Sequence, residues 1–244
     1  MSMSIERATL YEKYRLPYAD QAIPDLLDQM GKIKTVADIG AGTGQLSRLF
    51  APHCDRVYTL EPDPSMCAIA KDALAQFPNI TIIEASAEQT TLANNCVDLI
   101  VIGNAFHRFK SEACDELHRI LNNNGWIVLI SYLYTNKAFT DLLFSKLATV
   151  ETFTKKSEKA WKKTPQQNLF GIAEINTKSY QQSTAVDWKN FWGAARAGIE
   201  SPEKNETGFA QFKDINREVF DTFAVNQKLH LEYETHVSWS KKPL

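Results

Sequence analysis

The stretch that decides the fold is "VADIGAGTGQLS", residues 36–47. A run of apolar residues ends at Asp38, and three glycines at 40, 42 and 44 then alternate with small residues before a helical pattern begins. Turns of this kind lead from a buried strand into a helix beside a nucleotide. A dinucleotide fingerprint requires glycines spaced G-x-G-x-x-G, whereas residue 45 is Gln45. The turn therefore predicts a nucleotide-like ligand that differs from NAD.

Outward from this turn, two hydrophobic periods alternate between residues 34 and 132. Apolar runs predict strands at 34–40, 56–62, 80–86, 97–105 and 126–134. Helical spacing separates them, and Asp63 and Pro64 provide an N-cap and a first helical residue for one of these helices. Short strands that are apolar on both faces and alternate with helices predict a doubly wound α/β sheet.

The remaining segments are less regular. Further helices are predicted at 138–150, 187–198 and 209–224, and further strands near 175–184 and at 229–240. We expect a single domain, 1–244, with an N-terminal lid (1–30), a cofactor-binding core (31–135), and a substrate-pocket insertion with C-terminal strands (136–244). Aromatic residues of the last part are candidates for the pocket wall or for the core: Phe139, Phe153, Trp161, Trp188, Phe191 and Trp192.

Composition excludes some classes of protein. The formal net charge is −2 and 44% of the residues are hydrophobic, so the chain has no global attraction for nucleic acid or anionic lipid and can bury a sizeable core. No apolar run is long enough to span a membrane, and the first residues lack the pattern of a secretory signal. Four cysteines without ligand spacing predict reduced thiols in a cytoplasmic protein and no metal site.

Glu61 complements the glycine turn. It ends the second predicted strand, where the crevice of an open α/β sheet lies and where a carboxylate can accept both hydroxyls of a ribose. Asp38, by contrast, would repel a pyrophosphate but help to hold an ammonium group. A ligand with a ribose, an ammonium group and no phosphate fits this pair, and S-adenosylmethionine is such a ligand.

At this point the sequence resembles the class I S-adenosylmethionine-dependent methyltransferases, in particular the small-molecule type that includes trans-aconitate methyltransferases. The resemblance rests on residues 36–47, on "LEPDPSM" (60–66), "EASAEQTTL" (84–92), "VDLIVIGNAFHRF" (97–109) and "LNNNGWIVLI" (121–130). It implies a Rossmann-like, mostly parallel seven-stranded sheet with an antiparallel last strand and a helical lid. It also implies S-adenosyl-L-methionine as methyl donor, S-adenosyl-L-homocysteine as product, and no metal.

The resemblance also implies site residues. Those expected at the cofactor are Arg15, Asp38, Gly40, Ala41, Gly42, Glu61, Pro62, Met66, Ser86, Ala87, Glu88, Asn104, Ala105 and Phe106. The lid would bring Tyr11, Tyr14 and Tyr18 to the substrate, and Arg15 to a carboxylate of cofactor or substrate. His107 is a candidate general base, although a structural role is an alternative.

Three residues or segments depart from the family pattern. Ser86 stands where many relatives carry an aspartate that accepts the adenine amino group, Arg108 stands where many carry Trp, and "NNNG" (122–125) replaces a Lys-Pro-Gly-Gly turn. We therefore expect a weaker adenine contact, a more polar pocket rim and a change in local rigidity.

The expected activity is methyl transfer to an oxygen, nitrogen or carbon of a small molecule by a monomer or homodimer, with nucleic acid an improbable partner. Three alternatives stay open. The lysine-rich "KKSEKAWKK" (155–163) could serve an RNA methyltransferase, although such a run is more often a solvated face. The chain could also bind S-adenosylmethionine without turnover, or could be a nicotinamide oxidoreductase.

Overall fold

A computed structural model describes residues 3–160 and 164–243 of the chain, with the side chain of residue 160 left out. Within these residues one sheet contains the strands in the order β3-β2-β1-β4-β5-β7-β6. The strands are β1 (Thr35–Ile39), β2 (Arg56–Leu60), β3 (Ile80–Ile83), β4 (Val97–Gly103), β5 (Leu121–Tyr134), β6 (Asn176–Val186) and β7 (Leu229–Lys241). β1 to β5 pair in parallel, and β7 pairs antiparallel with both β5 and β6. The predicted mostly parallel sheet with an antiparallel last strand is confirmed.

Two helices precede β1, and the others lie between the strands. They are α1 (Ile5–Tyr14), α2 (Ala22–Met30), α3 (Gln45–Phe50), α4 (Pro64–Ala73), α5 (Glu112–Ile120), α6 (Lys137–Leu147), α7 (Glu151–Ala160), α8 (Gln166–Phe170), α9 (Trp188–Ala197) and α10 (Phe209–Phe223). Two short 3₁₀ turns, η1 (Ala51–His53) and η2 (Phe106–Arg108), follow α3 and β4. The lysine-rich segment begins within helix α7, while residues 161–163, Trp161 among them, lie outside the described residues.

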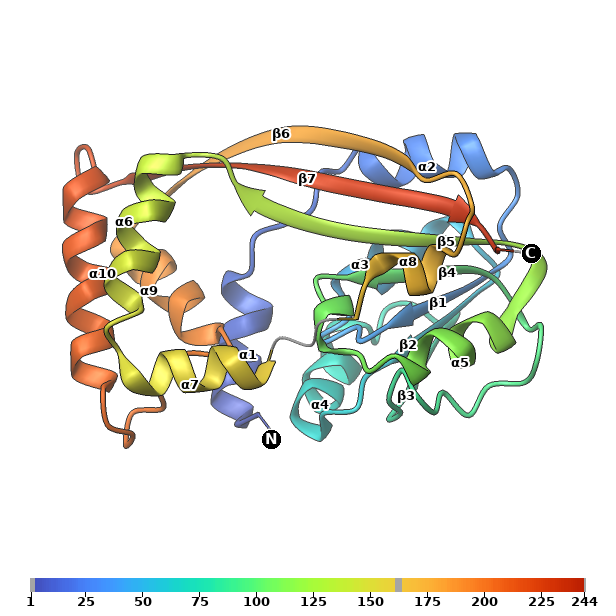
Figure 1. The fold of residues 1–244 in the computed structure, drawn as a ribbon, viewed down its shortest axis with the longest axis horizontal. Helices are drawn as coiled ribbons and strands as arrows, with labels where there is room; N and C mark the ends of the chain where they lie inside the picture. Colours follow the sequence, from blue (N-terminus) through green and yellow to red (C-terminus); the bar gives the residue numbers. More distant parts are fainter. Residues whose placement is uncertain (1–2, 161–163, 244) are drawn as a thin grey trace.

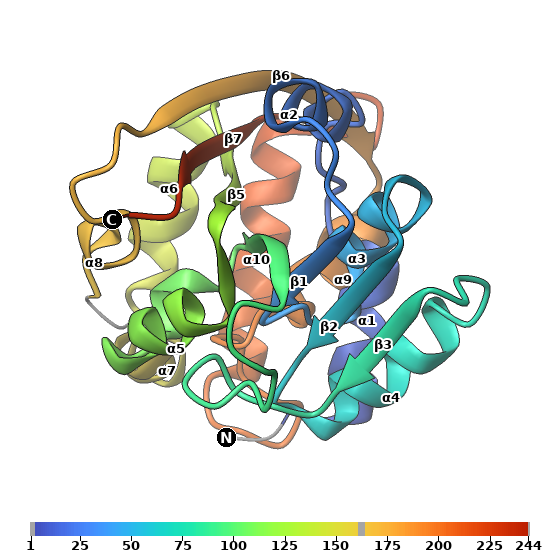
Figure 2. The same cartoon turned by 90° about the vertical axis from the view of Figure 1, so that its right-hand side faces the viewer.

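Two hydrophobic clusters cover the two faces of the parallel core. Side chains from α5 and α8, such as Leu117 and Phe170, pack on one face against Ile100 of β4. Side chains from α2 and α3, such as Leu26 and Phe50, pack on the other face. Figure 2 shows α5 and α8 on one side of the twisted sheet and α3 on the other. Because both faces are covered, the central strands contain continuous apolar runs.

Helices α6, α7, α9 and α10 form a helical cluster at one end of the molecule (Figure 1). The strands β5, β6 and β7 are 14, 11 and 13 residues long and extend from the parallel core to this cluster. A third hydrophobic core lies there, with Phe139, Phe191 and Phe212 among its buried side chains. The two ends of the molecule are thus joined by hydrogen-bonded strands.

The segment "NNNG" forms part of β5 and not a separate turn. Leu121 pairs with Val97, but Trp126 already pairs with Leu99, so the residues between Leu121 and Trp126 bulge out of the ladder. Asn122 donates a hydrogen bond from Nδ2 to Oδ1 of Asp98 at 2.7 Å, which holds the bulge against β4. The predicted strand at 126–134 therefore begins five residues earlier.

Candidate functional site

The carboxyl ends of β1, β2, β3 and β4 surround a cavity of about 220 Å³, which we call the smaller cavity. Ten of the expected cofactor residues line it: Gly40, Gly42, Glu61, Pro62, Met66, Ser86, Ala87, Glu88, Asn104 and Ala105. They come from four different strand ends, and the parallel sheet brings them to one edge.

The turn after β1 is held by its own backbone. The N–H groups of Gly40 and Ala41 both donate to the carbonyl of Leu60, at 2.9 and 3.0 Å. Gly40, Gly42 and Gly44 have φ values of +67°, +59° and +85°, which an L side chain adopts only with strain. A Cβ atom on Gly40 would also lie 2.8 Å from Cβ of Ala105. Glycine at position 40 therefore lets the turn approach the end of β4.

Glu61 lies at the wall of the smaller cavity and is 8% exposed. Its Oε2 accepts the N–H of Gly42 at 2.8 Å, and its Oε1 accepts the N–H of Asp63 at 2.9 Å. Burial raises the pKa of the Glu61 carboxyl above its usual value, although these two hydrogen bonds oppose the rise. The side chain therefore connects the glycine turn to the start of α4.

Asp38 lies beneath the turn and is 1% exposed. Its Oδ2 accepts hydrogen bonds from N and Oγ of Ser47, at 2.9 and 2.7 Å, and Ser47 Oγ accepts one from Thr59. Burial raises the pKa of Asp38 to about 7, while the bonds from Ser47 act against this. Asp38 thus fixes α3 under the turn and does not line the smaller cavity.

A larger cleft of about 1290 Å³ adjoins the smaller cavity. The two share the side chains of Met3, Tyr11, Asn104, Ala105, Arg108 and Ile199. Phe106, His107 and Arg15, which the sequence also predicted as site residues, line this cleft instead of the smaller cavity. The far wall comes from α6, from the last residue of α9 and from residues 198–200 after it.

Asn104 stands where the two spaces meet. It has a φ of +51°, and its Nδ2 donates to the hydroxyl of Tyr18 at 3.0 Å. Tyr18 is buried beneath it and lines neither space, whereas Tyr11 lines both. Tyr14 contacts α9, where its ring lies against the backbone of Gly193. Of the three lid tyrosines, only Tyr11 therefore lines the smaller cavity and the larger cleft.

His107 lies on η2, three residues after Asn104, and faces the larger cleft. Nε of Arg108 donates to its Nε2 at 3.3 Å. Burial, together with the positive charges of Arg108 and Arg15, lowers the pKa of His107 to about 4. The imidazole is therefore neutral at physiological pH.

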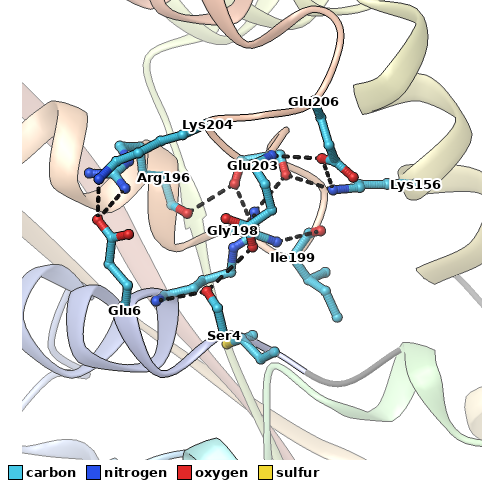
Figure 3. Close-up of polar contacts among 12 residues, drawn as sticks. Ser4, Glu6, Lys156, Arg196, Gly198, Ile199, Glu203, Lys204 and Glu206 are labelled. Atoms are coloured by element: carbon cyan, nitrogen blue, oxygen red, sulfur yellow. Dashed lines mark hydrogen bonds and ion pairs between the residues drawn. The ribbon is translucent and has the colours of Figure 1, made fainter.

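A polar network joins helix α1 to α9 and to the segment after it (Figure 3). Arg7, which is 6% exposed, donates to the carbonyls of Ile199 and Ser201 at 3.2 and 2.8 Å and pairs with Glu203 at 3.1 Å. Glu6 pairs with Arg196 of α9 at 2.7 Å. The network thus fixes α1 against the segment that follows α9.

Sequence reasoning missed several residues of this site. Asp63 caps α4 by accepting the N–H groups of Ser65 and Met66 on Oδ1, and its Oδ2 accepts the N–H of Met3 at 2.6 Å. The N-cap pattern predicted the first role but not the second. Met3 and Ile199 reach the site from segments without any motif, so only the folded chain identifies them.

The described residues contain neither a helix that could cross a membrane nor a group of three or more His, Cys, Asp or Glu side chains that could hold a metal ion. The four cysteines are free thiols.

Comparison with known proteins agrees with this geometry. Residues 37–129 match a family described as a methyltransferase domain. An uncharacterized methyltransferase of Schizosaccharomyces pombe is 32% identical over 124 residues, which are 49% of this chain and 48% of that protein. The chain therefore spans about half the length of the curated relatives it matches.

Solved structures show the same fold. The YcgJ protein of Bacillus subtilis aligns with 93% of this chain and all of its own, with a TM-score of 0.60 and 16% identity. A structure from Methanococcus maripaludis, described as a candidate S-adenosyl-L-methionine-dependent methyltransferase, aligns with 73% of this chain and 90% of its own, with a TM-score of 0.51 and 19% identity. The chain contains a methyltransferase domain of class I, the S-adenosylmethionine-dependent type. The trans-aconitate-like subtype stays a prediction.

Proposed function

We propose that the chain transfers the methyl group of S-adenosylmethionine to an oxygen, nitrogen or carbon nucleophile of a small-molecule acceptor by in-line displacement. The observation that carries this proposal is the junction of the two spaces at Asn104 and Ala105. A donor in the smaller cavity and an acceptor in the larger cleft would meet there. Holding two reactants in line accounts for much of the acceleration in such reactions.

The smaller cavity suits this donor better than a dinucleotide. Three carboxylates, of Glu61, Asp63 and Glu88, and one guanidinium, of Arg108, line it. Such a wall disfavours a pyrophosphate and favours a ligand with an ammonium group. A carboxylate offers about four lone-pair sites, and two of those on Glu61 already accept backbone N–H groups. The others would accept the ribose hydroxyls.

The remaining residues divide by position. Gly40, Ala41 and Gly42 would hold the methionine part with their backbone, on a turn that Asp38 steadies from below. Pro62 and Met66 would flank the adenine, and Ser86, Ala87 and Glu88 would meet its edge. Asn104, Ala105 and Phe106 would lie near the reacting groups.

Bound S-adenosylmethionine supplies a methyl group on a positively charged sulfur, so a deprotonated acceptor needs no base. If a hydroxyl or amine acceptor needs a base, His107 is the candidate by position, because it faces the cleft. Its lowered pKa of about 4 makes it a weak base, so alignment of the reactants would carry most of the acceleration. Residues 136–244 would build the acceptor side as part of a single domain, and the protein would work in the cytoplasm as a monomer or homodimer.

The alternatives find less support. In the lysine-rich segment, Lys155 pairs with Glu151, and Lys156 pairs with Glu206. These two cations are therefore already neutralised by the chain itself, which weakens the case for an RNA substrate. A binding protein without turnover differs from an enzyme only in that no acceptor yields S-adenosylhomocysteine.

The test is calorimetry with S-adenosylhomocysteine and with NAD, followed by an acceptor screen for S-adenosylhomocysteine production. We expect the first ligand to bind and NAD not to bind. Glu61→Ala should weaken S-adenosylhomocysteine about 10- to 100-fold, because hydrogen bonds to a charged group contribute about 1.5–3 kcal/mol. The matched control Glu232→Ala, on the exposed face of β7, should leave the affinity unchanged. Equal affinities of the two variants would refute the assignment.

A further inference from the structure

A third cavity, of about 470 Å³, lies inside the helical cluster, and we call it the cluster cavity. Its walls are mostly apolar and include Leu143, Leu147, Phe153, Phe191 and Phe212. Small-molecule pockets typically have volumes of about 300–1,000 Å³ and walls of this composition. The cluster cavity is therefore large enough for the apolar part of a small molecule.

Arg15 stands between the cluster cavity and the larger cleft and lines both. Its guanidinium lies 4.8 Å from the ring centres of Tyr11 and of Tyr132. Its Nε is buried and has no hydrogen-bond partner, and no carboxylate of the described residues forms an ion pair with it. The residue is half-buried and lines two open spaces, so its guanidinium, which has no counter-charge in the described chain, provides a site for an anion from outside.

The cleft between these features also has an apolar wall. Leu133 of β5 is 59% exposed and Phe144 of α6 is 54% exposed, and both side chains line the cleft. Phe144 lines the cluster cavity as well. An apolar surface therefore runs from the cleft into the cluster cavity on either side of Arg15.

We propose that the methyl acceptor is an amphipathic anion, with an apolar tail in the cluster cavity and an acidic group paired with Arg15. This inference rests on the proposed function. The acceptor's reactive end then lies in the larger cleft, which meets the smaller cavity at Asn104 and Ala105. Arg15 is thus a specificity-determining residue for the acceptor and not a ligand of the cofactor, whose cavity it does not line.

The experiment measures binding to protein saturated with S-adenosylhomocysteine. The probes are hexanoate, octanoate and decanoate, with decyl sulfate as a second acid and decan-1-ol and decylamine as uncharged and cationic counterparts. We expect decanoate to bind at least tenfold more tightly than decan-1-ol. Affinity should rise up to about fourfold per methylene, as for a group that leaves water. Decyl sulfate against decanoate identifies which acid the site prefers.

Substitutions at Arg15 and Ala194 test the acidic group and the apolar tail of the ligand separately. Arg15→Gln should reduce decanoate binding to the level of decan-1-ol and leave S-adenosylhomocysteine affinity within twofold, whereas Arg15→Lys should retain a preference for the acid. Ala194→Leu, in the wall of the cluster cavity, should remove the dependence on chain length. Ala73→Leu, on α4 and outside all three spaces, is its matched control. Thermal unfolding checks that each variant is folded.

Equal binding of decanoate and decan-1-ol would overturn the inference. So would an Arg15→Gln variant that loses S-adenosylhomocysteine and keeps decanoate, because the cation would then serve the cofactor. If the wild-type protein fails to bind S-adenosylhomocysteine, the proposed function itself is wrong. Binding of S-adenosylhomocysteine without any preference for an acid overturns this inference alone.

Discussion

At the scale of single residues, Gly40 shows how the turn depends on a missing side chain. Gly40→Ala would add the strain of a positive φ, about 1–2 kcal/mol for a residue other than glycine, and a contact of 2.8 Å with Ala105. Ala105 lines both spaces, so its displacement should weaken S-adenosylhomocysteine at least tenfold in calorimetry.

Gly31→Ala is a matched control for this change. Gly31 has a φ of +74°, but a Cβ atom there would have no neighbour within 4 Å. Because Gly31 also has a ψ of −153°, a combination that only glycine readily adopts, the control should lose at least as much backbone stability and keep its affinity for S-adenosylhomocysteine. If both variants lose affinity equally, general destabilisation and not the approach of the turn to β4 explains the result.

Asp38 makes the stability of the protein depend on pH. Its pKa is raised from 3.8 to about 7 in the folded chain, so folding favours the protonated carboxyl. The contribution to stability is fully present below about pH 4 and is lost as the pH rises through 7. Between pH 5 and 8, urea unfolding should show wild type losing up to about 3 kcal/mol relative to Asp38→Asn. Asp72→Asn, at an exposed position on α4, is the control, and its free energy of unfolding should change with pH as that of the wild type does.

At the scale of elements, Arg7 joins α1 to residues 198–206. Arg7→Leu would leave the carbonyls of Ile199 and Ser201 without their donor and should cost about 2–3 kcal/mol in urea unfolding. The exposed pair of Lys204 and Glu6 provides a control, and Lys204→Ala should cost less than about 1 kcal/mol.

Hydrogen exchange tests whether these elements act together. In Arg7→Leu, protection should fall both in α1 and in residues 198–206, and S-adenosylhomocysteine should bind more weakly because Met3, Tyr11 and Ile199 line its proposed cavity. Loss of protection in α1 alone would show that the segment after α9 is held by other contacts.

The elements also show what the sequence could predict. The strands of the core were predicted because their apolar runs are local, and Glu61 and Asn104 followed because a parallel sheet brings strand ends to one edge. The bulge at 122–125 depends on Asp98 across the sheet. The position of Arg15 between two aromatic rings, without a carboxylate, depends on α1 and β5, which carry Tyr11 and Tyr132. No local pattern carries such information.

At the scale of the whole molecule, charge argues against nucleic acid. The net charge is −2, and Lys155 and Lys156 pair with glutamates of the chain. We expect no RNA shift in gel assays at 150 mM salt, and no steep dependence on salt below it. A shift that weakens steeply with salt would revive the RNA alternative, and Lys155→Glu should then abolish it.

Beyond its bulge, β5 pairs without interruption from Trp126 to Tyr134, between the parallel core and the helical cluster, and this sets a further constraint. A strand advances about 3.3 Å per residue. The number of β5 residues therefore sets the distance between the proposed methyl donor in the smaller cavity and the proposed apolar tail in the cluster cavity, and no loop lies between them to change it. Removing one residue would turn every later side chain to the opposite face, while removing two would restore the faces and shorten the reach by about 7 Å. Relatives adapted to shorter or longer acceptors should therefore differ in steps of two residues along this strand.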